Sequence, residues 1–305
     1  MEASQGVGPG RPPQPQPVRE AGCPPHDHPH PPGTGEANDA GTEAWLYLYG
    51  IVPAAELDLS GLEGVEGGGD VFLVESAGLA CAASPVPHRQ YSQEALAARA
   101  EQAEWVAARA IRHQRVVDRL KATGSVIPLK FGTLCAACDD VRALLEAHRE
   151  ALGRRLDLLQ DREEWGVKVN ADLERARQAV EAVGSSSDET PPASAGEAYF
   201  LRKKRERQAK ERLMLRLGEL EDEIYSRLSL CAVEASKGAC FAASAASSHL
   251  PVLNAALLLD RGRLGMLEEI AGQLEADYRA YGIVVEITGP WAPYSFCGDL
   301  GRVPD

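Results

Sequence analysis

Residues 283–296 read IVVEITGPWAPYSF, and the last eight of them form the most informative stretch of the sequence. Residues 283–287 are apolar and mostly β-branched, apart from Glu286, which is typical of a strand buried in a sheet. Pro290 has no N–H group to donate to a sheet ladder, so we expect strand pairing to end there. We expect residues 289–296 to form a rigid, non-helical aromatic segment at the edge of a domain.

Strand and helix patterns alternate on the N-terminal side of this stretch. The long helix predicted at 197–230 carries an apolar stripe of Leu213, Leu217, Leu220, Ile224 and Leu228. The predicted order is strand 164–169, helix 172–183, helix 197–230, strand 239–245, strand 252–259, helix 263–280 and strand 283–287. Reduced to its β-α-β-β-α-β pattern, this order predicts a ferredoxin-like domain.

The first half of the chain has a different order, in which strands dominate. We predict strands at 45–52, 71–74 and 79–83, with a tight hairpin at Gly78 between the last two. A helix capped by Ser92 is expected to run to about Lys121, with an apolar stripe from Leu96 to Val117. An extended segment at 126–133 and a helix over about 138–160 complete this half.

These patterns predict an α+β fold with two domains. The N-terminal domain, a mixed β-rich α+β unit, covers 43–161, and the C-terminal ferredoxin-like domain covers 162–305 with a flexible insert at 184–196. Residues 1–42 hold ten of the twenty prolines and little that could form a core, which predicts a disordered Pro/His-rich tail.

Composition excludes several classes of protein. The chain has 305 residues with 32 Lys and Arg against 45 Asp and Glu, and the net charge of −13 argues against nucleic-acid binding. No apolar run is long enough for a membrane span, and no signal peptide is indicated, so we expect a cytoplasmic protein. The seven scattered cysteines suit free thiols better than a disulfide framework.

Motifs that carry chemistry are weak in this sequence. Cys135 and Cys138 have the spacing of a redox pair, but two small buried residues are the favoured interpretation. In the tail, Cys23 and the histidines at 26, 28 and 30 could bind a transition metal, although a chance His/Pro-rich linker is favoured. Common nucleophile and phosphate-loop motifs are absent. We therefore predict no enzyme, no cofactor, no metal site and no catalytic residue.

Two segments are candidates for binding a partner protein. A basic segment contains Arg202, Lys203, Lys204, Arg205 and Arg207. It is either a solvated helix face or a docking patch for an acidic protein, with RNA disfavoured by the overall charge.

The aromatic residues Trp291, Tyr294 and Phe296 form the second candidate. They either anchor the segment as a lid on their own domain or act as contact residues for a partner. Packing is expected to be the larger part of their role.

Several stretches resemble one known family. Residues 289–296, GPWAPYSF, resemble the C-terminal signature GPWPPYSF of the GvpL/GvpF family of gas vesicle proteins, with Ala292 in place of a proline. Residues 125–134, SVIPLKFGTL, resemble that family's Val-Leu-Pro-x-Arg-Phe-Gly-Thr signature, with Lys130 in place of the arginine. Further similar stretches lie at 47–52, 164–169, 196–201 and 254–261. Together they cover most of residues 45–296.

This resemblance implies a two-domain cytoplasmic protein that takes part in gas vesicle assembly or is a minor structural component of the vesicle. It implies contact with the small shell-forming subunit and with other gas vesicle accessory proteins, without catalysis. Two alternatives stay open: a thiol- or metal-dependent enzyme, based on Cys135 and Cys138 or on a cleft between the domains, and a ligand-sensing ferredoxin-like module.

Overall fold

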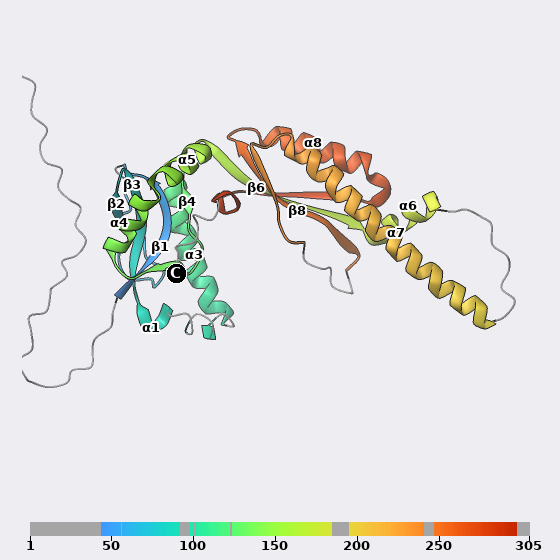
Figure 1. Cartoon of the computed structure of the whole chain (residues 1–305), viewed down its shortest axis with the longest axis horizontal. Coiled ribbons are helices and arrows are strands. Elements are labelled where there is room, and N and C mark those ends of the chain that lie inside the picture. Colours follow the sequence, from blue (N-terminus) through green and yellow to red (C-terminus); the bar gives the residue numbers. More distant parts are fainter. Residues whose placement is uncertain are drawn as a thin grey trace, which may run out of the picture. The chain divides into compact units, whose positions relative to one another are not determined.

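The computed structural model describes residues 44–297 except 56, 92–94, 96–97, 100–101, 123, 185–194 and 241–246. The predicted tail at 1–42, with its candidate metal ligands, and most of the predicted insert at 184–196 lie outside the described residues. The described part is a mixed α+β fold with two antiparallel sheets (Figure 1). No helix within it is long and apolar enough to cross a membrane.

The first sheet is built around one buried strand. Its elements are β1 (Ala44–Pro53), β2 (Phe72–Ser76), β3 (Leu79–Pro87), α1 (His88–Tyr91), α3 (Ala103–Lys121), β4 (Ile127–Pro128), β5 (Leu134–Cys135), α4 (Cys138–Ala147) and α5 (Arg149–Leu159). The strand order is β2-β3-β1-β4, with β5 also paired to β1. Residues 46–52 of β1 are all buried, as expected for an aromatic and aliphatic strand. The predicted hairpin is confirmed: Ser76 pairs with Leu79, and Gly78 takes a positive φ of 80° in the turn.

The helices of this half differ from the prediction. Helix α3 begins at Ala103, not at Ser92, which lies outside the described residues. Its buried face consists of His113, Val116, Val117 and Leu120, whereas Ala103 and Ala107 of the predicted stripe are exposed. The predicted stripe was mostly alanine, which has little apolar area to bury, so the larger side chains of the last two turns decide which face packs. The predicted helix over 138–160 is two helices, α4 and α5, separated at His148.

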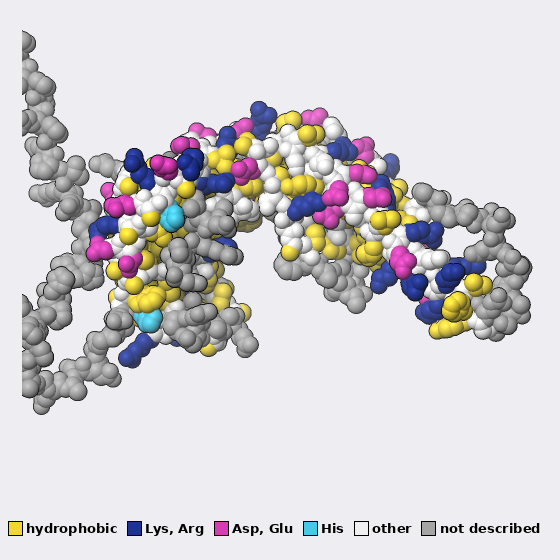
Figure 2. All heavy atoms as spheres, viewed as in Figure 1, with side chains coloured by type: hydrophobic (Ala, Val, Ile, Leu, Met, Phe, Trp, Pro, Cys, Tyr) yellow, Lys and Arg dark blue, Asp and Glu magenta, His cyan; other side chains and the backbone are white. Residues whose placement is uncertain are grey.

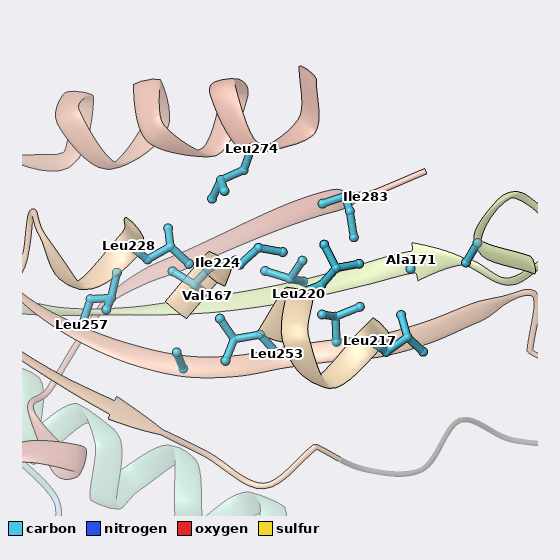
Figure 3. Close-up of a cluster of buried hydrophobic side chains, with 14 of the residues drawn as sticks. Val167, Ala171, Leu217, Leu220, Ile224, Leu228, Leu253, Leu257, Leu274 and Ile283 are labelled. Carbon is cyan, nitrogen blue, oxygen red and sulfur yellow. The ribbon is translucent and has the colours of Figure 1, made fainter. Parts of the chain in front are cut away.

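The second sheet has the order β7-β8-β6-β9, with each neighbouring pair antiparallel. Its elements are β6 (Arg162–Asp172), α6 (Leu173–Gly184), α7 (Ala195–Ser229), β7 (Glu234–Lys237), β8 (His249–Asp260), α8 (Leu264–Asp277), the 3₁₀ turn η1 (Arg279–Tyr281) and β9 (Val284–Trp291). Residues of α6, α7 and α8 share one hydrophobic cluster with β6 and β8. Leu217, Leu220, Ile224 and Leu228 of α7 lie against this sheet in Figure 3. The predicted apolar stripe of α7 is therefore confirmed, because all five of its residues are buried.

Two strand predictions in this half differ from the structure where it describes them. The strand expected at 239–245 is instead β7 at Glu234–Lys237, which pairs with residues 255–258 of β8. Ala239 and Cys240 are not in a strand, and 241–246 lie outside the described residues. Neither Ala239 nor Cys240 has the β-branched side chain that packs well on a sheet.

The strand pairing of β9 also continues beyond Pro290. Trp291 pairs with Glu164 after an irregularity in the ladder between Glu164 and Gly166, so the ladder needs no N–H from the proline. Residues Tyr294–Phe296 then form a short 3₁₀ turn, η2, so the expectation of a wholly non-helical segment is wrong for these three residues.

Candidate functional site

The cysteine pair does not have the features of a redox site. Cys135 is a buried free thiol, and burial raises its pKa, the reverse of the lowered pKa that a reactive thiol needs. Cys138 is disulfide-bonded, so the two cysteines do not pair with each other, and the expectation of free thiols is wrong for Cys138. Within the described part of the chain, no group of three or more His, Cys, Asp or Glu side chains could hold a metal ion.

The three aromatic residues of the C-terminal segment do not share one surface. Trp291 is 50% exposed, and its indole N–H donates a hydrogen bond to Thr288 Oγ1 at 3.2 Å. Tyr294 is half-buried, and Phe296 is buried. Among the three, only Trp291 thus presents a large apolar area to a partner. The other two have a packing role.

Tyr294 reaches the core of the first sheet through His113 of α3. The Tyr294 hydroxyl is hydrogen-bonded to His113 Nε2 at 3.0 Å, and His113 Nδ1 is hydrogen-bonded to the Tyr47 hydroxyl at 3.0 Å. Ala292 is buried in the same core cluster, and Tyr294 packs against it. The C-terminal segment thus covers the N-terminal core, whereas a lid on its own domain was one of the two sequence expectations.

His113 is held as a neutral ring in this cluster. It is buried beside Tyr47 and Tyr49, whose rings lie within 6 Å of its own, and burial lowers its pKa to about 4. Both ring nitrogens have a hydroxyl partner, which suits a neutral imidazole that donates at one nitrogen and accepts at the other. Sequence reasoning did not single out His113 as a site residue. The available signal was a polar residue in the same helical stripe as Val116, Val117 and Leu120.

A second contact ties the same segment to β6. The carboxylate of Glu164 is buried and accepts hydrogen bonds from the backbone N–H and the hydroxyl of Ser295, at 2.9 and 2.8 Å. Burial raises the pKa of Glu164, and the two bonds from Ser295 oppose that rise. Lys121 at the end of α3 donates to the carbonyl oxygen of Pro290 at 3.0 Å. Hydrogen bonds therefore hold residues 290–296 to α3, which packs on the first sheet, and to β6 of the second sheet.

The basic segment at 202–207 lies on the N-terminal part of α7, and every residue in it is exposed. Its local ion pairs are Arg202 with Glu206 at 3.8 Å, Lys203 with Glu206 at 2.9 Å, and Arg207 with Glu211 at 3.3 Å. Exposed pairs of this kind contribute little to stability, typically about 0–1 kcal/mol. Figure 2 shows Lys and Arg side chains together with hydrophobic ones over this part of α7. The two exposed aromatic residues there are Tyr199 and Phe200, at 57% and 68% exposure.

Comparison with known proteins places this architecture in one family. The model of the family described as gas vesicle synthesis protein GvpL/GvpF matches residues 45–298. Gas vesicle protein L of a Streptomyces species is 31% identical over 261 residues, which are 84% of this chain and 94% of that protein.

Two crystal structures of gas vesicle protein GvpF have a similar fold. The protein from Anabaena matches with a TM-score of 0.60 and 18% identity, covering 86% of this chain and 98% of that one. The protein from Microcystis aeruginosa matches with a TM-score of 0.53 and 18% identity, covering 83% and 98%. The family match spans both sheets and the C-terminal segment that joins them. This chain belongs to the GvpL/GvpF family of gas vesicle proteins.

Proposed function

We propose that this chain is a non-catalytic assembly protein or minor structural component of gas vesicles, and that it contacts the small shell-forming subunit. The observation that carries the proposal is the family match over residues 45–298, which includes both sheets. The protein would act in the cytoplasm and at the gas vesicle, together with other gas vesicle accessory proteins. Contact with another protein, unlike catalysis, needs only an exposed surface of suitable shape and charge.

The chemistry of the cysteines favours this proposal over the enzyme alternative. An enzyme based on Cys135 would need a thiolate near neutral pH, and burial raises the pKa of that thiol. Its neighbour Cys138 is disulfide-bonded and offers no second thiol.

Two domains fit the distribution of the hydrophobic cores. We place the boundary between 43–161 and 162–305, because one core cluster draws on β1, β3 and α3 and the other on β6, β8 and α7. A ferredoxin-like C-terminal domain is supported by the order β7-β8-β6-β9, in which the first and third strands of a β-α-β-β-α-β unit lie at the centre. The tail at 1–42 and the insert at 184–196 would be accessory segments.

Partner contact is assigned to the exposed candidates. The basic segment and Trp291 are accessible, whereas Phe296 is buried and the Tyr294 hydroxyl is engaged by His113. An aromatic side chain with a polar N–H group is a frequent contact residue, and a positive patch steers an acidic partner.

Direct binding tests this proposal. We expect the purified full-length chain to bind the purified shell subunit, with cross-links that map to the basic segment on α7 or to the region of Trp291. A biolayer measurement with immobilised chain, followed by mass-spectrometric mapping, would check it. An unrelated acidic protein of similar size serves as the control. Equal binding of both proteins, or cross-links confined to other regions, would contradict the proposed contact.

A further inference from the structure

The N-terminal part of α7 extends beyond the region where the helix packs on its sheet (Figure 1). Among the described side chains between Tyr199 and Arg212 none is buried, and the buried stripe starts at Leu213. At about 1.5 Å of rise per residue, this exposed stretch is roughly 20 Å long. A helix in which only Leu201 and Ala209 are partly buried over such a length gains little from packing, so its other described side chains are available to a partner.

The charge of this stretch is opposite to that of the whole chain. Between residues 199 and 212 there are seven Lys and Arg residues and two Glu residues, which gives 7 − 2 = +5, while the whole chain carries −13. The two carboxylates, Glu206 and Glu211, pair with Arg202, Lys203 and Arg207. The stretch therefore keeps a large local excess of positive charge, which attracts an acidic partner.

An apolar groove lies beside this basic stretch, between α6 and α7. It has a volume of about 620 Å³. Its apolar lining comes from both helices and from β8, and comprises Leu173, Val180, Ala209, Leu213, Met214 and Leu250. Arg177 and Lys210 lie at the groove together with Glu181 and Glu206. Met214 is 50% exposed, so apolar surface here remains open to solvent.

We propose that this groove, together with the basic stretch of α7, docks an amphipathic α-helix of another gas vesicle protein, one that carries Asp or Glu residues beside its apolar face. The proposal rests on the gas vesicle function proposed above and adds the chemistry of the partner. The space between two helices suits a third helix, whose apolar face fills the groove at i, i+3, i+4 and i+7 positions. The local excess of +5 selects carboxylates along the flank of that helix.

Peptide binding to the full-length chain tests this inference. Labelled peptides of about 20 residues, tiled across the other gas vesicle proteins of the same organism, are titrated by fluorescence anisotropy. We expect the tightest binders to be acidic peptides with a helical apolar stripe. Raising the salt concentration from about 50 to about 300 mM should weaken them several-fold.

Two variants separate the groove from the charge. Ala209→Trp fills the groove, and the double variant Lys203→Glu/Arg207→Glu reverses charge on the basic segment. Each should weaken the acidic peptides about tenfold or more. The matched control is Arg142→Glu/Arg154→Glu, which also breaks two exposed helical pairs, with Asp139 and Glu150, and should leave binding unchanged. Circular dichroism checks that each variant folds, and Ala209→Leu, which fills less of the groove and leaves the charge unchanged, serves as a second groove variant if Ala209→Trp does not fold.

Several results would overturn this inference. These are no peptide binding, tightest binders that are basic or lack an apolar stripe, binding unaffected by the groove variants, or a single-stranded oligonucleotide that binds more tightly than any peptide. If the groove variants keep full binding to the shell subunit and full vesicle formation, the groove inference fails while the gas vesicle function stands. If the unaltered chain neither binds the shell subunit nor supports vesicle formation, the proposed function itself fails, whether or not any peptide binds.

Discussion

Replacing Leu220 by Ala lowers the free energy of unfolding by about 2–5 kcal/mol, whereas replacing Leu215 by Ala changes it by less than about 0.5 kcal/mol. Leu220 is fully buried among β6, β8 and the other α7 residues of the C-terminal core, and Leu215 is 68% exposed. Both substitutions remove the same atoms from the same helix, so any change in intrinsic helix propensity is equal. The difference between the two losses of unfolding free energy therefore measures what burial of the Leu220 side chain contributes to stability.

Urea denaturation of the full-length chain measures this difference, provided that the m-value stays constant across the variants. The Leu215 variant is the control, because it lies on the solvent side of the same helix. Similar midpoints for the two variants would show that α7 does not pack on the sheet through this stripe.

Lowering the pH from about 6.5 towards 4 removes stability that depends on His113. The folded state lowers the pKa of this ring to about 4, because burial disfavours the charged form. The unfolded state, whose histidine pKa is near 6.5, binds a proton throughout that range while the folded state does not. His113 therefore contributes fully above about pH 6.5, and the contribution falls by up to roughly 3 kcal/mol as the pH approaches 4.

A variant without the titrating ring separates this effect from other groups. In His113→Gln, the unfolding free energy no longer falls with pH through the protonation of this ring. Glu164 has a raised pKa in the folded state, so it adds stability as the pH falls, and this opposite contribution is the same in both proteins. Urea denaturation at pH 7 and pH 5 gives the change in unfolding free energy for both proteins. If both lose equal stability between the two pH values, His113 is not held neutral in the core.

The sequence indicated those elements whose pattern is strong over many residues. The leucine and isoleucine stripe of α7 repeats over sixteen positions, and the buried strand β1 is apolar along most of its length. Alanine-rich segments were harder, because alanine fits a strand, a helix face or a loop and adds little apolar area. For this reason the expected strand was wrong at Ala239 and Cys240, and the expected apolar stripe was wrong at Ala103 and Ala107, although its last residue, Val117, is buried.

The two candidate partner-binding segments also differ in how much of their environment the sequence predicts. Exposure of the basic segment follows from its own composition, since a dense run of Lys and Arg is rarely buried. The environment of Trp291, Tyr294 and Phe296 does not follow from their local sequence. It depends on which core lies beside β9, and the partner His113 is 181 residues away from Tyr294 along the chain. Periodicity within a segment carries no information about such a contact.

Vesicle formation in cells is the most direct test of the central claim, that this chain acts in making gas vesicles without catalysing a reaction. Cells that form vesicles are deprived of this chain and then supplied with the unaltered chain or with the variant Cys135→Ser, and buoyant vesicles are counted by light scattering and electron microscopy. The account predicts that vesicles are lost without the chain and return with both forms, because burial raises the pKa of the Cys135 thiol and leaves it a poor nucleophile. Normal vesicle numbers without the chain, or a correctly folded Cys135→Ser protein that restores none, would contradict it.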